Sequence, residues 1–402
     1  MNLTLRFCGL FIPKNDRYLL FGSWLGDSYS DNSRYLFEYL INTENEFKLI
    51  WIGKTHLQGL IPKSDKVVFC RKNSLKSIFY ILRSKYVFVS QGILDLFDTN
   101  IFKRTCIIYL SHGAALKKWG DDDPSKPTIG GNSIKQKLSA CHIKILGGWP
   151  QYSFCVVTSP LHGNCLRSAI AFLGGRTTTL IPSGYPRNDL LLHASYLERQ
   201  QFKEKYARQI GFSTHKKVIL YVPTFRRTHT KIESFCHRPS DETKRIRSIL
   251  QQNNAVLIEK NHYATYANNE LCSVCKMEKD LIYLNKEDNL AVNIQELLLV
   301  IDVLISDYSS ILFDYVLLDK PSICFAYDYE YYRDIDSGLY YEIDDYSTGR
   351  VTSSFEETCE ELERLLMGYD NYVDKRKYVR EKYMPYDQGH ASEIIINTVI
   401  KR

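Results

Sequence analysis

Long hydrophobic runs are missing from this chain of 402 residues. No segment approaches the roughly 18 to 20 consecutive apolar residues that a helix needs to span a bilayer. The start of the chain also lacks a clear cleavage pattern of a secretory signal peptide. Both absences favour a protein that stays in the cytoplasm.

Strong charge imbalance and low-complexity sequence are missing as well. The 52 Lys and Arg residues against 46 Asp and Glu residues give a formal net charge of +6, which by itself does not indicate binding to nucleic acid. There is no charged tail, no low-complexity block and no internal repeat of fixed period, which excludes extensive disorder, solenoids and propellers. Because 44% of the residues are hydrophobic, the chain can fill two hydrophobic cores.

Patterns typical of metal sites are sparse. The eleven cysteines are scattered, and only Cys272 and Cys275 lie close together, without a second such pair or paired histidines to complete a zinc site. The acidic triplet Asp121–Asp123 precedes a Pro-Ser-Lys-Pro loop and is more typical of a solvated loop than of a metal site. We therefore expect reduced cysteines, no metal and no cofactor.

Short apolar runs recur along the chain between helical stretches. They are rich in Val, Ile, Phe and Tyr and apolar on both faces, which is typical of parallel strands buried between two layers of helices. The runs are RYLLFG, KLIWI, KVVFC, KYVFVS, CIIYL and FCVVT in the first half and KVILYV, AVLIE, DLIYL, DVLIS and PSICF in the second. This order predicts an α/β protein with two doubly wound, Rossmann-type domains.

The turn-rich segment Gly184–Asp189 marks the expected boundary between the two domains. A long helical pattern follows it and ends at Gly211. We expect a first domain over residues 1–195, a second over 196–373, and a C-terminal helix within 374–402 that packs back on the first domain.

Polar side chains follow several apolar runs directly, at the strand ends where open α/β sheets bind ligands. His112 and Gly113 come right after CIIYL. A histidine there can act as a general base, because its ordinary pKa is near 6.5, and the glycine lets a substrate approach the backbone. The alternative is a histidine that is only hydrogen-bonded at the end of a strand. We expect groups from both domains to face one central cleft.

The segment Ser306–Ser310 predicts the end of a strand, a turn and the start of a helix. A helix start attracts a diphosphate through its unpaired N–H groups and the positive end of its dipole. The alternative is an ordinary N-cap formed by Asp307 or Ser309. Positive charge to neutralise a diphosphate without a metal would come from three side chains: Arg226, Lys260 and His262.

A basic stretch runs from Lys54 to Lys85, where eight Lys and Arg residues stand against a single acidic residue, Asp65. This surplus could attract anionic lipid headgroups. The alternative is a solvated outer helix that covers the sheet through four apolar side chains at helical spacing: Leu75, Ile78, Phe79 and Leu82.

Six segments of the chain, in a fixed order, resemble those of a known family. They are GSWLGDSYSDNSRYLFEYL, SHGAALKKWG, GYPRNDLL, YVPTFRR, EKNH and SDYSSILFDYVLLDKPSICFAYDYEYYRDIDSGLYYEID. The chain resembles the CDP-glycerol glycerophosphotransferases, which make wall teichoic acids and related capsule polymers. Departures from the family pattern at Ala114–Ala115, Tyr263 and residues 387–394 leave the exact donor and acceptor open.

The resemblance implies a GT-B-like architecture, with the donor nucleotide mainly in the second domain and the acceptor mainly along the first. It implies CDP-glycerol or CDP-ribitol as the donor, CMP as the product, and a lipid-linked or oligosaccharide acceptor at the inner face of the cytoplasmic membrane, with no nucleic-acid partner. His112 would be the catalytic base. The residues expected to bind the substrates are Gly113, Lys117, Thr224, Arg226, Lys260, His262, Asp307, Ser309, Ser310 and Asp314.

Several roles stay open at this point. Asp314 either faces the substrate or orders the turn that carries the serines, and Arg187 and Asp189 are either ligands or a hinge pair between the domains. A GT-B glycosyltransferase that moves a sugar from a nucleotide-sugar for surface polysaccharide synthesis would share the same layout. A non-enzymatic adaptor of a polymer export complex is the third possibility, and it would release no CMP.

Overall fold

The chain folds into two compact units, each with its own parallel β-sheet. The computed structural model describes residues 2–124, 151–171, 177–227, 232–261, 280–284 and 292–400. Unit 1 comprises Met1–Ala114, Trp119–Asp189 and Pro385–Arg402, and unit 2 comprises Ala115–Lys118 and Leu190–Met384. The domain limits drawn from sequence, at 195/196 and 373/374, stay predictions.

Unit 1 is built on a sheet of seven parallel strands within the described residues, in the order β3-β2-β1-β4-β5-β6-β7. Leu19 of β1 lies opposite Leu49 of β2 and Tyr86 of β4, so β1 and β4 form the switch point of a doubly wound sheet. The strands are β1 (Asn15–Gly22), β2 (Lys48–Gly53), β3 (Val67–Arg71), β4 (Ser84–Val89), β5 (Cys106–Tyr109), β6 (Phe154–Val157) and β7 (Thr179–Pro182).

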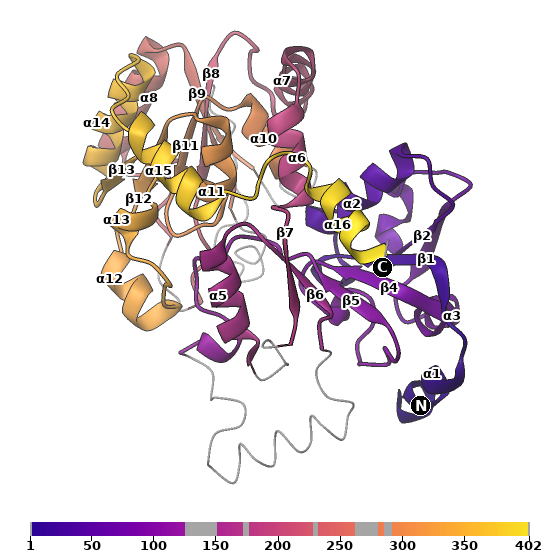
Figure 1. The fold of residues 1–402 in the computed structure, drawn as a ribbon. Coiled ribbons are helices and arrows are strands. Elements are labelled where there is room, and N and C mark those ends of the chain that lie inside the picture. Colours follow the sequence, from indigo (N-terminus) through magenta and orange to yellow (C-terminus); the bar gives the residue numbers. More distant parts are fainter. Residues whose placement is uncertain are drawn as a thin grey trace. The chain divides into compact units, whose positions relative to one another are not determined.

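Helices cover both faces of this sheet (Figure 1). On one face α2 contacts α16, and on the other α1 contacts α3 beside a buried apolar core that includes Ile81, Val87 and Ile107. The helices of this part of the chain are α1 (Asn2–Phe11), α2 (Asp31–Asn42), α3 (Leu75–Arg83), α5 (Pro160–Ala169), α6 (Pro186–His193) and α16 (Ala391–Ile400).

Unit 2 contains, within the described residues, a sheet of six parallel strands in the order β10-β9-β8-β11-β12-β13. This is the Rossmann order, with its switch point between β8 and β11. The strands are β8 (Lys217–Val222), β9 (Ala255–Glu259), β10 (Leu281–Tyr283), β11 (Val303–Ser306), β12 (Ser322–Phe325) and β13 (Arg350–Thr352). The helices are α7 (Tyr196–Ile210), α8 (Ser240–Gln252), α10 (Ile294–Val300), α11 (Ile311–Tyr315), α12 (Tyr329–Tyr331), α13 (Ile343–Tyr346), α14 (Phe355–Leu366) and α15 (Val373–Tyr383).

All eleven apolar runs predicted as strands are confirmed, and the prediction of two doubly wound α/β domains is confirmed with them. Two strands of the described residues were missed. The first, β7, has only two consecutive apolar residues, Leu180 and Ile181, before a proline, and the second, β13, has only Val351. Neither offers an apolar run long enough to stand out in the sequence.

The long helix predicted before Gly211 is wrong in one respect, because the structure has two helices there. Ser195 interrupts the pattern with a capping box: its hydroxyl accepts from the backbone N–H of Glu198, and its own N–H donates to the Glu198 carboxylate. Gly211 ends α7 as predicted, at a positive φ of 91°.

The C-terminal segment also holds two helices instead of the single one predicted. Helix α15 belongs to unit 2, and α16 belongs to unit 1, where it contacts α2. Asp189 caps α16, since its two carboxylate oxygens accept from the N–H groups of Ala391 and Ser392 at 2.9 and 3.0 Å. Asp189 thus satisfies two N–H groups in the first turn of α16, a role that was not among the two considered from sequence, a ligand or part of a hinge pair.

Gly184 brings the middle and the end of the chain together within unit 1. Its φ is 74°, and a Cβ there would lie only 2.6 Å from the Asp387 carboxyl carbon. Asp387 accepts hydrogen bonds from the Tyr185 N–H and the Asn188 amide. The resembling segment GYPRNDLL is thus hydrogen-bonded to the C-terminal segment around Asp387, where the chain departs from the family pattern. No helix in the part of the chain that the structure describes has the length and apolarity to cross a membrane.

Candidate functional site

His112 lies at the carboxyl end of β5 with an exposed side chain. The residue before it, Ser111, has a φ of 61°, a left-handed conformation that is strained for a residue with a side chain. Hydrogen bonds hold it there: Asn32 donates to the Ser111 carbonyl at 2.9 Å, and Tyr185 donates to its hydroxyl at 3.2 Å. Strain of this kind is concentrated at functional sites.

A buried ion pair fixes the backbone of His112. Nη1 of Arg187 donates to the His112 carbonyl oxygen at 2.7 Å and to Oδ1 of Asp31 at 2.8 Å. The two side chains are only 8% and 5% exposed. Asp31 itself has a positive φ of 63° at the start of α2. The sequence therefore predicted the histidine correctly at a strand end, and the ion pair explains how its position is held.

The imidazole of His112 has a defined orientation. Its Nδ1 lies 3.4 Å from the carbonyl oxygen of Ser90, and its ring packs edge-on against Trp24 with centroids 6.0 Å apart. A carbonyl oxygen can only accept, so this contact favours hydrogen on Nδ1 and leaves Nε2 as a proton acceptor. That is the arrangement that a general base needs.

A second histidine of unit 1, His162, is buried nearby in a hydrogen-bonded chain. Its Nδ1 accepts from the backbone N–H of Thr158 at 3.2 Å. Burial, and to a smaller extent the nearby His112, lowers the pKa of His162 to about 3. His162 therefore stays neutral at physiological pH and serves the packing around Tyr185.

In unit 2 the ends of β8 and β11 are joined through Arg226 and Asp307. Nη2 of Arg226 lies 2.9 Å from Oδ2 of Asp307, and both side chains are at most 1% exposed. Asp307 also accepts from the backbone N–H of Thr224 at 2.9 Å. Asp328 binds the other edge of the guanidinium, with distances of 2.8 and 2.9 Å. Arg226 is thus enclosed by carboxylates, which favours a positioning role over direct contact with a ligand.

Three tyrosine rings surround the same guanidinium. Tyr308, Tyr327 and Tyr332 place their ring centroids 5.0, 5.4 and 4.8 Å from the Cζ atom of Arg226, within the range of cation–π attraction. Tyr332 begins a π-helical turn, Tyr332–Asp336, a feature that is frequent at functional sites. The ammonium of Lys117 lies 5.6 Å from the Tyr332 centroid, so Lys117 belongs to this cluster.

Lys117 and Lys260 of unit 2 both have a strongly lowered pKa. Burial lowers the pKa of Lys117 to about 8, with Asp307 opposing the shift and Arg226 adding to it. Burial alone lowers the pKa of Lys260, which follows β9, to about 8. Both groups keep their charge at pH 7 at a desolvation cost, and a bound anion would offset that cost.

The predicted phosphate-binding helix is short, because α11 has five residues and continues into a 3-10 turn, Val316–Leu318. Ser309 and Ser310 are partly exposed, and the Ser309 hydroxyl accepts from the N–H of Ile311 at 3.4 Å. Asp314 is 3% exposed and accepts from the Gln295 amide at 3.0 Å, which favours its structural alternative. The two serines stay predictions as ligands.

Three predicted site residues remain to be placed: Gly113, Thr224 and His262. Gly113 follows His112 and accepts from the Ser111 hydroxyl at 3.1 Å, and Thr224 is 5% exposed. His262 lies outside the described residues. Among the residues that the structure does describe, no group of three or more His, Cys, Asp or Glu side chains could hold a metal ion.

Several residues of these clusters escaped the sequence reasoning. They are Trp24, Asp31, Ser90, Tyr308, Asp328 and Tyr332. A signal existed for most of them, because Trp24 and Asp31 lie in the first resembling segment and the three from unit 2 lie in the last. Their membership in those segments marked them as candidates, although it gave no role.

Two Rossmann-type units, one presenting a histidine at a strand end and the other a buried cationic cluster at its switch point, define a GT-B-like transferase. The sequence model of CDP-Glycerol:Poly(glycerophosphate) glycerophosphotransferase matches residues 4–401. The chain belongs to this family. The predicted family and the predicted enzyme class are confirmed, and they are preferred to the nucleotide-sugar glycosyltransferase and the adaptor.

Known proteins are similar to this chain over nearly its whole length. A teichoic acid poly(glycerol phosphate) polymerase of Bacillus spizizenii is 30% identical over 408 residues, which cover 99% of this chain and 95% of that protein. A teichoic acid glycerol-phosphate transferase of Staphylococcus aureus is 25% identical, with 96% and 94% covered. The solved structure of the wall teichoic acid polymerase TagF matches with a TM-score of 0.76 at 22% identity and covers 96% and 90% of the two chains. That likeness confirms the GT-B-like fold.

Proposed function

We propose that the protein transfers glycerol phosphate, or a related polyol phosphate, from CDP-glycerol to a hydroxyl of a membrane-linked acceptor and releases CMP. The product would be a teichoic-acid-like or capsular polymer. The observation that carries the proposal is the exposed imidazole of His112, held at the end of β5 by Ser90 and Arg187 in a member of this family.

In the proposed reaction the acceptor oxygen attacks the phosphorus next to the polyol. A new P–O bond forms to the acceptor, the P–O bond to CMP breaks, and Nε2 of His112 takes the proton of the hydroxyl. Position and charge stabilisation supply most of the catalysis in such displacements.

Unit 2 would bind the diphosphate of the donor. Lys117 and Lys260 keep their positive charge at pH 7 in buried surroundings, where a charge–charge interaction is stronger than in water. Thr224, Ser309 and Ser310 would add hydroxyl groups. Arg226 and Asp307 would hold the ends of β8 and β11 in register, so that these groups meet the phosphates in a fixed arrangement.

The donor is proposed to be CDP-glycerol, with CDP-ribitol as the close alternative. The relatives whose names specify glycerol phosphate support the first. Thermal stabilisation of the purified protein separates the two, because a ligand that binds only the folded state raises the melting temperature. A larger shift with CDP-glycerol than with CDP-ribitol, and none with UDP-sugars, is the expected result.

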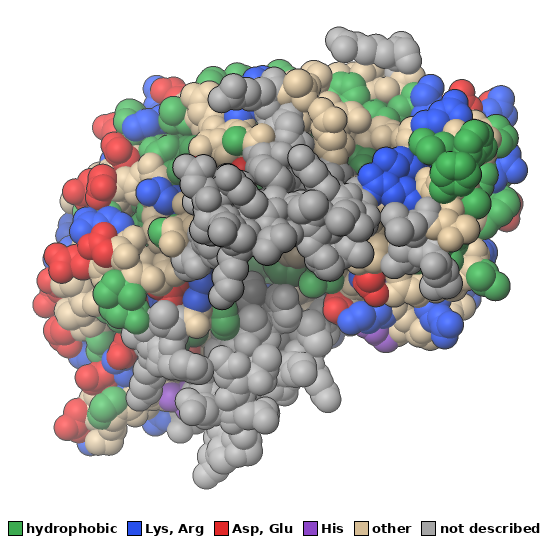
Figure 2. Space-filling view, turned by 90° about the horizontal axis from the view of Figure 1, so that it is seen from below, with side chains coloured by type: hydrophobic (Ala, Val, Ile, Leu, Met, Phe, Trp, Pro, Cys, Tyr) green, Lys and Arg blue, Asp and Glu red, His purple; other side chains and the backbone are tan. Residues whose placement is uncertain are grey.

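Association with the inner face of the membrane is proposed through α1 and α3. These two helices contact each other and expose four large apolar side chains to solvent: Phe7 (62%), Phe11 (70%), Leu75 (86%) and Phe79 (48%). In Figure 2, green hydrophobic side chains lie next to blue Lys and Arg side chains on the right-hand side, the side of α1 in Figure 1. Exposed aromatic groups flanked by cations favour the interface of an anionic bilayer.

The direct test is incubation of the purified protein with CDP-glycerol and a synthetic lipid-linked acceptor, followed by mass spectrometry of the products. One added mass step of glycerol phosphate would identify a priming enzyme, and a ladder of steps would identify a polymerase. Absence of CMP release with CDP-glycerol, CDP-ribitol and several acceptors would contradict the proposal.

A further inference from the structure

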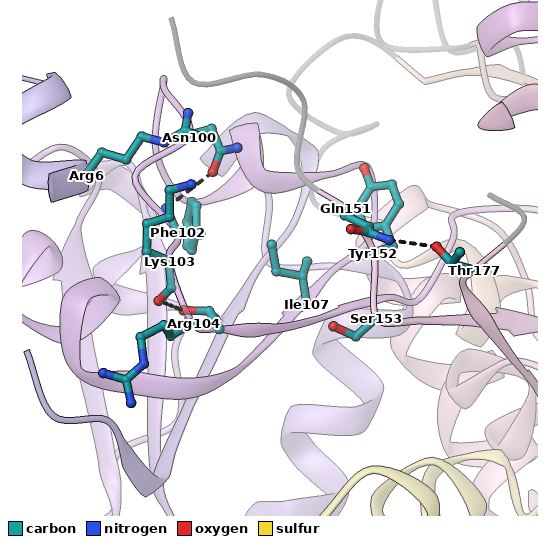
Figure 3. Close-up of a pocket in the computed structure, with 11 residues that line it drawn as sticks. Arg6, Asn100, Phe102, Lys103, Arg104, Ile107, Gln151, Tyr152, Ser153 and Thr177 are labelled. Carbon is teal, nitrogen blue, oxygen red and sulfur yellow. Dashed lines mark hydrogen bonds between the residues drawn. The ribbon is translucent and has the colours of Figure 1, made fainter. Parts of the chain in front are cut away.

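A pocket of about 430 Å³ lies in unit 1 at the amino ends of β5, β6 and β7. Most of its lining residues precede these strands, Ile107 lies within β5, and Arg6 of α1 closes one side (Figure 3). His112 follows β5 at the opposite end of the sheet. The pocket is therefore separate from the residues assigned to glycerol phosphate transfer.

The charged side chains that line the pocket are all basic. Arg6, Lys103 and Arg104 line it, and none of its described lining residues is acidic. Arg104 has a positive φ of 53° and donates from Nη1 to the carbonyl oxygen of Leu10 at 3.0 Å, which ties the end of α1 to the pocket wall. The buried Nη1 of Arg6, by contrast, has no hydrogen-bond partner among the residues that the structure describes.

The positive charges repel each other in half-buried surroundings. Burial lowers the pKa of Arg6, and burial followed by the nearby Arg6 lowers the pKa of Lys103. An anion bound between the two cations would attract both and so offset their mutual repulsion.

The opposite wall offers hydrogen-bonding groups. Gln151 and Thr177 lie across the pocket from Arg6 and Lys103 in Figure 3, and the Gln151 amide donates to the Thr177 hydroxyl at 2.7 Å. Ser153 adds a further hydroxyl to the lining. Cations on one side with amide and hydroxyl groups on the other suit an oxyanion that accepts several hydrogen bonds.

We propose that this pocket binds a phosphate group, either on the headgroup of an anionic phospholipid or as a free phosphate. The phospholipid is favoured by the helix that supplies Arg6, because the same helix exposes Phe7 and Phe11, which are 62% and 70% exposed. A headgroup in the pocket would place its acyl chains beside these rings. The inference goes beyond the transfer reaction and does not depend on it.

The test compares the full-length protein with the double variant Arg6→Gln/Lys103→Gln in two arms. The first arm titrates inorganic phosphate by calorimetry at constant ionic strength. The second measures co-sedimentation with vesicles of phosphatidylglycerol and phosphatidylcholine. Loss of two cations near an anionic surface is expected to weaken binding roughly tenfold or more. The control Arg17→Gln/Arg167→Gln removes the same charge from exposed positions of unit 1 that lie outside both the pocket and the basic stretch Lys54–Lys85.

Two further variants keep the test decisive if the first folds poorly. Gln151→Glu adds a carboxylate at an exposed position of the pocket wall and is expected to weaken binding, whereas Arg6→Lys/Lys103→Arg keeps the charge and is expected to preserve most of it. Weaker binding in the phosphate arm identifies a free phosphate as a ligand, and weaker binding in the vesicle arm alone identifies a headgroup. Equal binding by wild type, pocket variants and control in both arms, or no binding by wild type, overturns the proposal.

Discussion

Nη1 of Arg187 donates a 2.7 Å hydrogen bond to the carbonyl oxygen of His112. The same nitrogen is paired with Asp31, so the backbone of the proposed base rests on a buried ion pair. A guanidinium can serve the carboxylate and the carbonyl together because its donors have a fixed planar geometry, which an ammonium lacks. Arg187 is therefore a positioning residue for His112 in our proposal.

Arg187→Lys is expected to lower kcat about 10- to 100-fold, since a displacement of about 1 Å at a reacting group costs activity on that scale. The KM for CDP-glycerol should change much less, because Arg187 belongs to unit 1 and the proposed donor groups to unit 2. Steady-state kinetics with both substrates check this. Arg34→Lys is the control, since Arg34 pairs with Glu38 within α2. An unchanged kcat in Arg187→Lys would contradict the positioning role.

His112→Ala is expected to abolish turnover while donor binding stays nearly intact. The side chain is exposed, so its removal should change the melting temperature little. CMP release measures turnover, and thermal stabilisation by CDP-glycerol measures binding. The control is His56→Ala. It removes another exposed imidazole of unit 1, whose Nε2 lies 2.9 Å from the Asp27 carbonyl oxygen. Wild-type activity in His112→Ala would mean that another group is the base.

Local sequence carried the prediction of the fold and of His112. The runs that became β5 and β8 are apolar on both faces, and a polar residue just after such a run must lie at the sheet edge where ligands bind. The partners of those residues could not be predicted in this way. Arg187 lies 156 residues from Asp31 in the sequence, and no local period relates them.

Arg226 shows most clearly that the partners of a site residue could not be predicted from the sequence. Its place after β8 is right, but the role as a phosphate ligand, expected from its charge, its place at the strand end and the family resemblance, stays a prediction. The structure encloses it between Asp307 and Asp328, the latter 102 residues away in the sequence. The enclosure depends on the parallel order of β8, β11 and β12, which brings three strand ends together, and a single segment carries no information about that order.

Arg226→Ala is expected to destabilise the protein by about 3–5 kcal/mol, because it leaves Asp307 buried without its counter-charge. Denaturant unfolding monitored by circular dichroism measures the loss. Arg333→Ala is the matched control: Arg333 pairs with Asp334 at 2.7 Å on the surface, where an ion pair contributes at most about 1 kcal/mol. Equal losses in the two variants would show that Arg226 does not hold the strand ends.

Phe7→Ser/Phe11→Ser is expected to reduce co-sedimentation with phosphatidylglycerol vesicles several-fold. The two rings contact each other with centroids 5.1 Å apart and are mostly exposed, so the change removes apolar surface that would enter the bilayer interface. Tyr196→Ser/Leu197→Ser is the control, since these side chains of α7 are 73% and 70% exposed in unit 2. Equal reduction in both variants would indicate general hydrophobic adsorption and would contradict docking through α1.

The lysines of unit 2 predict opposite effects of pH on stability and on donor binding. The pKa of Lys260 is about 8 in the folded protein and about 10.5 when unfolded, so the unfolded chain binds more protons between these values. Stability contributed by this group therefore rises as pH increases from about 8 to 10.5. Binding of the donor diphosphate needs the charged ammonium, so it should weaken over the same rise in pH.

Lys260→Met separates the two effects. The variant should be at least as stable as wild type at pH 7, because a buried charge is gone, and it should bind CDP-glycerol more weakly with a flatter dependence on pH between 7 and 9. Thermal unfolding and calorimetric titration across that range measure both quantities. Lys244→Met, at a position whose side chain is 75% exposed on α8, should reproduce wild type. If Lys260→Met binds the donor with wild-type affinity and the same pH profile, Lys260 does not contact the diphosphate, and Lys117 becomes the remaining buried lysine of unit 2 proposed to do so.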